Sequence, residues 1–260
     1  MDNIKAIFFD IDGTLVSFKT HAIPQSAIQA VHAARKKGVK IFIATGRPLP
    51  FIDNLGSLEY DGIISVNGAM CATADGETIY RSSVCRTDLE RLIEYYRETP
   101  FPIAFASDEE VFLTDQNAQT EEIFSLLKVR PTKIAPIEHC LDMPVMQIIA
   151  FFPENRESYL MSDVLKGCSA HRWHPYFADV ISKGNSKSHG IDIMLHHYGI
   201  PLSESMAFGD GGNDISMLSH VAYGVAMGNA NDEVKAAARY VTASVDEDGI
   251  AATLKTFLNL

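Results

Sequence analysis

Two aspartates separated by a single residue, Asp10 and Asp12, follow an apolar run near the start of the chain, in the stretch FFDIDGTL (8–15). In an extended strand, residues i and i+2 project from the same face, so these two carboxylates would lie side by side. Like charges at that separation raise one of the two pKa values unless a cation lies between them. The pair therefore indicates a bound metal, a shared proton or the start of a helix.

Further polar residues come directly after other apolar runs. Thr45 follows IFIA, Asn67 follows ISV, and Asp210 and Asp214 follow MAFG. Singly, each could be a helix cap or a turn residue. Ligands of open parallel sheets bind outside the carboxyl ends of the strands, so we expect these side chains to meet at one edge of a sheet. Carboxylates gathered there would repel one another, and oxygen ligands with room for water suit Mg²⁺.

The elements that must position these residues alternate between strand and helix. Residues 4–9 and 39–45 are predicted strands, and the helix between them is opened by Pro24 and closed by Gly38. A third strand is predicted over 62–66. Because these strands are almost continuously apolar, they are typical of a parallel sheet covered by helices on both faces.

The middle of the chain has a different pattern of predicted helices and strands. From about residue 83 an amphipathic helix (87–98) is followed by mixed strands and helices, and after residue 182 the alternation of helix and apolar strand returns. We therefore predict an α/β protein with a Rossmann-like parallel-sheet core built from 1–82 and 183–260. Residues 83–182 would form an inserted α+β cap.

Composition excludes several classes of partner. The chain has 260 residues, 47% of them apolar, and a net charge of −11, which disfavours nucleic acid and anionic membrane surfaces. We see no signal peptide, and the longest apolar stretch (143–152) is too short to span a bilayer. Four scattered cysteines fit reduced thiols in a protein core better than disulfides or zinc ligands. We expect a cytoplasmic protein that is a monomer or a weak homo-oligomer.

Four motifs, in order, carry a resemblance to a known family. DIDGTL (10–15), TGR (45–47), the region of Lys187 and GDGGND (209–214) resemble the motifs of the haloacid dehalogenase-like phosphatase superfamily. The insertion between the second and third motifs is similar to that of its Cof-like subfamily of sugar-phosphate phosphatases. The resemblance implies a Mg²⁺-dependent phosphatase acting on small phosphorylated metabolites, with sugar (hexose) phosphates as the expected substrates.

The same resemblance implies a role for each acidic residue. Asp10 would be the nucleophile that forms an aspartyl-phosphate, and Asp12 would be the general acid and base. For the metal, the expected ligands are the carboxylates of Asp10 and Asp210 and the backbone carbonyl of Asp12. Asp214 would hold the metal or its waters.

The phosphoryl group would be bound by Thr45, Gly46, Lys187 and Asn213. Lys183 is an alternative to Lys187 in the stretch KGNSKSHG, although Lys187 aligns with the motif. Asn213 could instead orient Asp214 or cap a helix.

Substrate contacts are expected mainly from the cap. Asp179, in the stretch HRWHPYFADV (171–180), is the candidate for binding sugar hydroxyls, whereas Trp173 could contact the substrate or belong to the core of the cap. Arg47 and Asn67 are further candidates, and Arg47 could equally form a structural salt bridge.

Two rival functions remain to be distinguished. A phosphomutase would use the same aspartyl-phosphate but return the phosphoryl group to another hydroxyl. A phospho-receiver also combines acidic residues, Thr and Lys around Mg²⁺, but it has no need of an acid and base such as Asp12. A P-loop nucleotide-binding protein is disfavoured because G-x-x-x-x-G-K-[ST] is absent from the sequence.

Overall fold

The chain forms two compact units. The computed structural model describes residues 4–131 and 133–260, apart from the side chain of Trp173, so the predicted role of Trp173 lies outside the described residues. The first unit, which we call the core unit, contains the chain up to Gly46, Asp53–Tyr80 and Ser186–Leu260. The second, which we call the inserted unit, contains Arg47–Ile52 and Arg81–Asn185.

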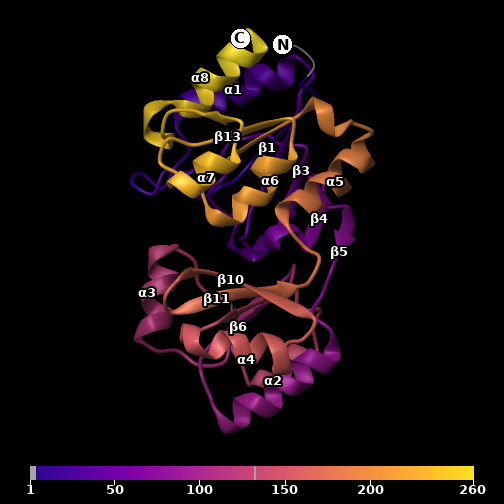
Figure 1. Cartoon of the computed structure of the whole chain (residues 1–260), viewed down its shortest axis with the longest axis vertical. Coiled ribbons are helices and arrows are strands. Elements are labelled where there is room, and N and C mark those ends of the chain that lie inside the picture. The colour runs from indigo at the N-terminus through magenta and orange to yellow at the C-terminus, as the bar shows by residue number, and fades with distance from the viewer. Residues whose placement is uncertain (1–3, 132) are drawn as a thin grey trace. The chain divides into compact units, whose positions relative to one another are not determined.

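The core unit is built on one sheet of eight strands within the described residues (Figure 1). In spatial order these are β14 (Tyr240–Val241), β13 (Tyr223–Ala226), β12 (Ser205–Gly209), β1 (Ala6–Phe9), β2 (Lys40–Ala44), β3 (Gly62–Ser65), β4 (Met70–Thr73) and β5 (Thr78–Arg81). The pairs from β14 through β3 are parallel, and β4 runs antiparallel to β3. Strands from both ends of the chain therefore lie side by side, with β1 between β12 and β2.

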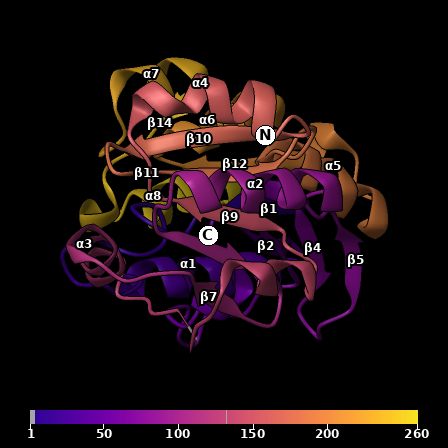
Figure 2. The same cartoon turned by 90° about the horizontal axis from the view of Figure 1, so that it is seen from below.

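Helices cover both faces of this sheet, as Figure 2 shows. One face carries α5 (Lys187–Tyr198), α6 (Ile215–His220) and α7 (Asp232–Ala237), and the other carries α1 (Gln25–Lys36) and α8 (Gly249–Leu258). Alternate strand residues such as Phe8, Phe42 and Ile64 pack against Ile191 and Met194 of α5. The predicted α/β fold, a parallel sheet covered on both faces, is confirmed.

The inserted unit has a sheet and a core of its own. Its strands, in spatial order, are β10 (Cys168–His174), β11 (Phe177–Ser182), β9 (Gln147–Ala150), β6 (Ile103–Ala106), β7 (Val111–Leu113) and β8 (Lys133–Ile134). These strands pair antiparallel except for β7 with β8. The pattern of the sequence did not identify β10, because its polar residues lack a clear alternation.

Each face of the second sheet buries a separate apolar cluster. On one face lie α2 (Arg86–Glu98) and α4 (Glu157–Tyr159), which continues into a π-helical turn (Leu160–Val164). On the other face lies α3 (Ala118–Leu126), which packs Ile123 and Phe124 against the sheet. The inserted unit therefore combines one mostly antiparallel sheet with helices on both of its faces.

The observed division differs from the predicted boundaries at residues 81–82 and 183–185, which adjoin the two junctions, and at residues 47–52. Residues 47–52 were expected in the core but group with the inserted unit. The reason is Phe51, which is buried in the cluster around α3 and contacts Phe124 edge-on with 6.3 Å between ring centroids. Residues 47–52 thus follow a strand of the core unit in sequence, but Phe51 holds them by apolar contacts in the inserted unit.

The structure also bears on membrane association. None of the helices in the described part of the chain combines the length and the apolar character that crossing a membrane requires.

Candidate active site

Polar residues gather at the carboxyl ends of the parallel strands of the core unit. Asp10 follows β1, Thr45 follows β2 and Asp210 follows β12, while Asn67 follows β3 by two positions. Because β12, β1, β2 and β3 are parallel neighbours, their carboxyl ends share one edge of the sheet. The structure therefore brings together at one edge the residues that the sequence places after apolar runs.

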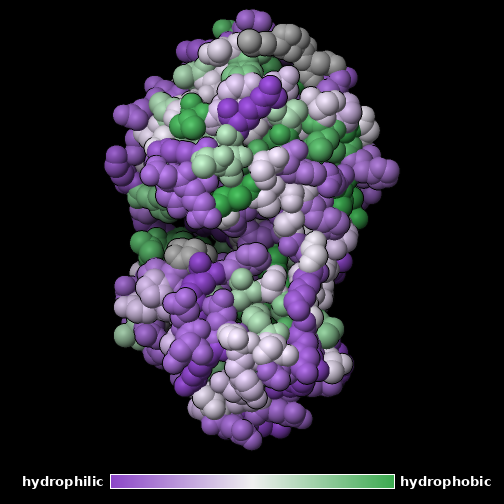
Figure 3. Space-filling model, viewed as in Figure 1, coloured by the Kyte–Doolittle hydropathy of each residue, from purple (hydrophilic) through white to green (hydrophobic). Residues whose placement is uncertain are grey.

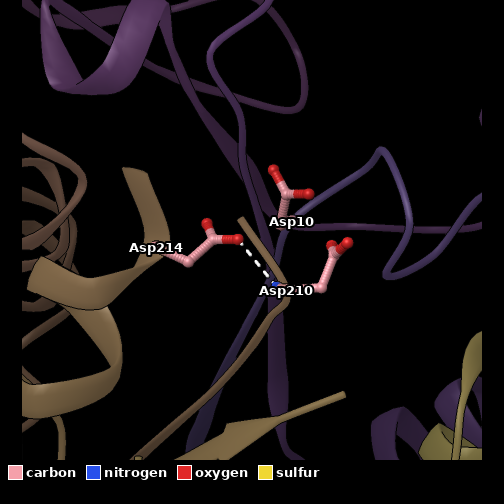
Figure 4. Close-up of side chains that lie close together, drawn as sticks. All are labelled: Asp10, Asp210 and Asp214. Carbon is pink, nitrogen blue, oxygen red and sulfur yellow. Dashed lines mark hydrogen bonds between the residues drawn. The ribbon is translucent and has the colours of Figure 1, made fainter. Parts of the chain in front are cut away.

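Three carboxylates form the centre of this edge. Ligand atoms of Asp10, Asp210 and Asp214 all lie within 4.8 Å of one another. Figure 4 shows their side chains converging from the two strand ends and from the short helix over Gly212–Asp214. Asp10 and Asp214 are buried, and Asp210 is half-buried. This is a dense concentration of negative charge in a poorly solvated place.

The surroundings shift the pKa values of these acids upward. Burial, followed by the charge of Asp214, raises the pKa of Asp10 well above its usual value, although Lys187 opposes the shift. Burial likewise raises the pKa of Asp210 to about 7, against a lowering effect of the Thr14 hydroxyl. Such shifts mean that a cation brought among these oxygens would relieve an unfavourable interaction.

Lys187 is the basic group of the cluster. Its Nζ donates to Asp10 Oδ1 at 2.5 Å and to Asp214 Oδ1 at 2.6 Å, and the side chain is fully buried. Burial alone would lower the pKa of this amine, but the charges of Asp10 and Asp214 outweigh it and raise the pKa above its ordinary value. Lys183 instead donates to the carbonyl of Lys166 within the inserted unit. Of the two lysines that the sequence offered, the structure places Lys187 against Asp10.

Asp214 has both carboxylate oxygens engaged. Oδ1 accepts from Lys187, and Oδ2 accepts the backbone N–H groups of Asp210 at 2.9 Å and Gly211 at 2.8 Å. This arrangement makes Asp214 an anchor for the Asp210 loop and for the lysine.

Asp210 is oriented by two residues that the sequence interpretation did not single out. Thr14 Oγ1 donates to Asp210 Oδ1 at 2.8 Å, and Asn229 Nδ2 donates to Asp210 Oδ2 at 3.1 Å. Asn229 also donates to the carbonyl of Gly13 at 2.9 Å. The signal for Asn229 was present, because it follows β13 just as the other site residues follow their strands.

Gly13 is required where it stands. Its φ is +82°, and a Cβ there would lie 2.2 Å from Asp210 Oδ2. The loop after Asp10 can therefore approach Asp210 only with glycine at this position.

The strand geometry expected for Asp10 and Asp12 was wrong, although the charge of Asp12 does help to raise the pKa of Asp10. Strand β1 ends at Phe9 and a turn begins at Ile11, so the i, i+2 geometry of a strand does not apply. Of the neighbouring charges that raise the pKa of Asp10, Asp12 has the smallest effect and Asp214 the largest. Asp12 remains half-buried, whereas Asp10 is buried.

The other side of the site is formed by amides and a threonine. Thr45 is buried, and its carbonyl accepts the N–H of Asn67 at 3.0 Å. The side chain of Asn213 donates to Asn67 Oδ1 at 2.9 Å. A Cβ on Gly46 would lie only 3.1–3.3 Å from these two amides. Asn67, Asn213 and Gly46 thus lie in contact beside the carboxylates.

The two remaining candidates belong to the inserted unit. Asp179 is buried on β11, paired with His171 of β10. Arg47 donates from Nη1 to the carbonyl of Phe51 at 2.9 Å.

The donor set at the strand ends fits a hard divalent cation. It offers only carboxylate oxygens, the acids repel one another in a buried place, and a single lysine supplies the balancing charge. Oxygen-only donors of this kind favour Mg²⁺ over softer metals. The residues present are thus compatible with a bound Mg²⁺.

Comparisons with known proteins agree with this geometry. The family model described as haloacid dehalogenase-like hydrolase matches residues 7–254. A subclass IIB sugar phosphatase, BT4131, has a solved structure that is 44% identical, with a TM-score of 0.90 over 98% of this chain and 100% of the other. BT1666 from Bacteroides thetaiotaomicron, described among the phosphatases of the same superfamily, is 38% identical, with a TM-score of 0.91 over 99% and 96% of the two chains.

A relative from Bacillus subtilis, the putative phosphatase YkrA, is 32% identical over 255 residues, which cover 96% of each chain. The family match spans nearly the whole sequence, so both units are included in it. The chain therefore belongs to the haloacid dehalogenase-like hydrolases and, within them, to the Cof-like phosphatases.

Proposed function

We propose that this phosphatase hydrolyses phosphate monoesters of small metabolites, with hexose phosphates as the favoured class, through an aspartyl-phosphate on Asp10 and with Mg²⁺ as cofactor. The observation that carries the proposal is the position of Asp10. Its carboxylate lies at the end of the central strand, with Lys187 bound to one oxygen and two further carboxylates beside it.

In the first step, a carboxylate oxygen of Asp10 attacks phosphorus and the bond from phosphorus to the leaving oxygen breaks. Lys187 binds Oδ1, which leaves Oδ2 for the attack. Asp12, in its acid form, donates a proton to the departing alkoxide. The products of this step are an alcohol and an acyl phosphate.

In the second step, water attacks the phosphorus of the aspartyl-phosphate. Asp12, now a carboxylate, accepts a proton from that water, and the bond between phosphorus and the Asp10 oxygen breaks. This restores the carboxylate of Asp10 and releases inorganic phosphate. One side chain thus serves first as acid and then as base, which requires that it stay separate from the cluster that holds the metal.

Mg²⁺ would be held by the carboxylates of Asp10 and Asp210 and by the backbone carbonyl of Asp12. When bound, it supplies positive charge that offsets the phosphoryl oxygens and allows the anionic nucleophile to approach them. Thr14 and Asn229 hold Asp210 for this role, and Asp214 supports it by binding Lys187 and the Asp210 backbone.

The phosphoryl oxygens would be bound by Thr45, Gly46, Lys187 and Asn213. These groups can donate hydrogen bonds and carry no negative charge of their own, so they would stabilise the charge that develops in the transition state. The inserted unit would act as a cap that binds the leaving group through Asp179 and Arg47. Trp173 is a third candidate for this contact, on the basis of the sequence alone. The naming of BT4131 as a sugar phosphatase supports a sugar as that leaving group.

The state of the protein in solution is part of the same proposal. We propose a monomer or a weak homo-oligomer, since few large apolar side chains are exposed among the described residues: Phe18, Leu126, Ile134, Tyr159, Val241 and Leu260. Figure 3 shows hydrophobic residues interspersed among hydrophilic ones on the face in view. The cytoplasmic location and the absence of nucleic-acid and membrane partners stay predictions.

The test is phosphate release from a panel of phosphorylated metabolites that includes hexose 6-phosphates. We expect Mg²⁺-dependent release that stops with EDTA and returns when Mg²⁺ is restored. Asp10→Asn should abolish turnover, and Asp12→Ala should slow hydrolysis of the acyl phosphate, so that ³²P-labelled phosphoenzyme accumulates.

Three results would contradict the proposal: turnover by Asp10→Asn, activity indifferent to EDTA, or an Asp12→Ala variant as fast as the wild type. Conversion of a hexose 6-phosphate into its 1-phosphate without release of phosphate would instead identify a phosphomutase.

A further inference from the structure

A strained turn lies beside the phosphoryl-binding residues. Val66, Asn67 and Gly68 follow β3 with φ values of +52°, +49° and +93°, so three successive residues are left-handed. For a β-branched residue such as Val66 this conformation is a genuine outlier. Val66 is fully buried, and Asn67 is also buried. Strain of this kind persists only where the surrounding structure holds the backbone firmly, and it is concentrated at functional sites.

The turn is tied to the site by two contacts of Asn67. Its backbone N–H donates to the carbonyl of Thr45 at 3.0 Å, and its Oδ1 accepts from Nδ2 of Asn213 at 2.9 Å. Asn213 itself is exposed, so a buried amide binds an amide that faces solvent. The left-handed backbone and the hydrogen bond are both needed at position 67. Among residues other than glycine, asparagine is one of the few that tolerate this conformation.

We propose that Asn67 is a positioning residue that fixes the amide of Asn213 for binding the transferring phosphoryl group; this rests on the proposed function. An exposed asparagine samples several rotamers, and ordering it when substrate binds costs conformational entropy. The bond from Asn213 to Asn67 uses one of its two amide hydrogens and leaves the other for an anion. Asn67 therefore acts through Asn213 and not as the substrate contact that the sequence suggested.

The variant that tests this is Asn67→Gly. Glycine keeps the left-handed backbone without strain, so the substitution removes the side chain and little else. We expect the dissociation constant for inorganic phosphate, measured by calorimetry with Mg²⁺ present, to rise about tenfold, as expected for loss of one preorganised hydrogen bond. The value of kcat/KM for p-nitrophenyl phosphate should fall by a similar factor.

The double variant Asn67→Gly/Asn213→Ala separates positioning from direct contact. If Asn67 acts through Asn213, the double variant should be no worse than Asn213→Ala alone, because the second change removes nothing further. Multiplied effects of the two substitutions would overturn the proposal, since they would indicate an independent contact. So would a phosphate affinity unchanged in Asn67→Gly.

Asn259 offers a matched control. It also has a left-handed backbone, with φ of +52°, at the end of α8. Asn259→Gly should leave phosphate affinity and kcat/KM unchanged, and a loss as large as that of Asn67→Gly would contradict the assignment. If the wild type hydrolyses no phosphate ester, the proposed function fails, but the coupling measured by phosphate binding still decides the role of Asn67, because it needs no turnover.

Discussion

At the scale of single residues, the surroundings differentiate three aspartates of the same chemical type. Asp10 has one oxygen bound by Lys187, Asp214 has both oxygens engaged in hydrogen bonds, and Asp210 is held by a hydroxyl and an amide. The three side chains are therefore held by different partners: Lys187 for Asp10, Lys187 and two backbone N–H groups for Asp214, and Thr14 and Asn229 for Asp210. In the proposed mechanism, this difference suits Asp10 to attack the substrate and Asp210 to hold the metal.

The stability of the metal-free protein should fall as pH rises through the pKa of Asp210. That pKa is about 7 in the folded state against an ordinary 3.8, chiefly because of burial, so the folded state binds the proton more tightly than the unfolded state. The stabilisation is fully present below about pH 4 and is lost as pH rises towards 7. In EDTA, we therefore expect the melting temperature of Asp210→Asn to fall less than that of the wild type between about pH 3.8 and about pH 7.5.

Calorimetry with and without Mg²⁺ checks this prediction. At the higher pH, added Mg²⁺ should stabilise the wild type and not Asp210→Asn, because the variant lacks a ligand. The exposed Asp53 gives a control, since Asp53→Asn should behave like the wild type. Equal pH dependence in wild type and Asp210→Asn would show that Asp210 is not the titrating group.

At the scale of elements, the position of α5 depends on two glycines. Gly68, in the turn after β3, faces the first turn of α5, where a Cβ would lie 2.0 Å from the carbonyl oxygen of Ser186. Gly190, within α5, faces Ile64 of β3, where a Cβ would lie 2.5 Å from Cγ2. Ser186 caps the helix by accepting the N–H of His189 at 3.1 Å. This close packing sets the place of Lys187 at the helix start.

Gly68→Ala should therefore cost activity as well as stability. Alanine at φ +93° is strained by about 1–2 kcal/mol, and its Cβ must also displace the carbonyl of Ser186 and with it Lys187. We expect kcat to fall by roughly 100-fold, the effect of a catalytic group misplaced by about 1 Å.

Gly76 provides the comparison, because its φ is +91° in the turn between β4 and β5 and nothing lies within 4 Å of a Cβ there. Gly76→Ala should lose a similar amount of stability and keep its activity. Chemical denaturation and steady-state kinetics on both variants distinguish the two effects. Similar kcat values would mean that α5 does not depend on Gly68.

At the scale of the whole molecule, each unit buries its own core, and the cysteines are distributed between these cores. Cys71 lies in the core unit, and Cys140 and Cys168 lie in the inserted unit, all of them buried. Burial raises the pKa of each of these three thiols to about 12. Cys85, by contrast, is exposed, so the expectation of four core cysteines was wrong for this one.

The native protein should therefore present one reactive thiol. Reaction with Ellman's reagent at neutral pH should modify Cys85 rapidly and leave the other three unmodified, because the thiolate is the reacting form. All four should react in denaturant, and Cys85→Ser should remove the fast phase. Rapid reaction of a second thiol in the native protein would show that one of the two cores opens readily.

The sequence by itself determined the class of fold and the strand ends at which the chemistry gathers. Apolar runs followed by Asp10, Thr45 and Asp210 predict parallel strands with polar carboxyl ends, because that edge is where such sheets bind ligands. The ordered motifs also predicted the family. Apolar runs, the polar residues that follow them and the order of the motifs are all local features, so they can be recognised along the sequence without knowledge of the fold.

Tertiary structure decided which of these residues contact one another. The pairing of Lys187 with Asp10 joins positions 177 residues apart, and the bond from Asn213 to Asn67 joins positions 146 apart. Local sequence does not encode such contacts, because they depend on where α5 and the loop after β12 come to lie against the sheet. For the same reason, only the fold showed that Asp214 binds the Asp210 backbone, that Asn229 holds Asp210, and that Phe51 places residues 47–52 in the inserted unit.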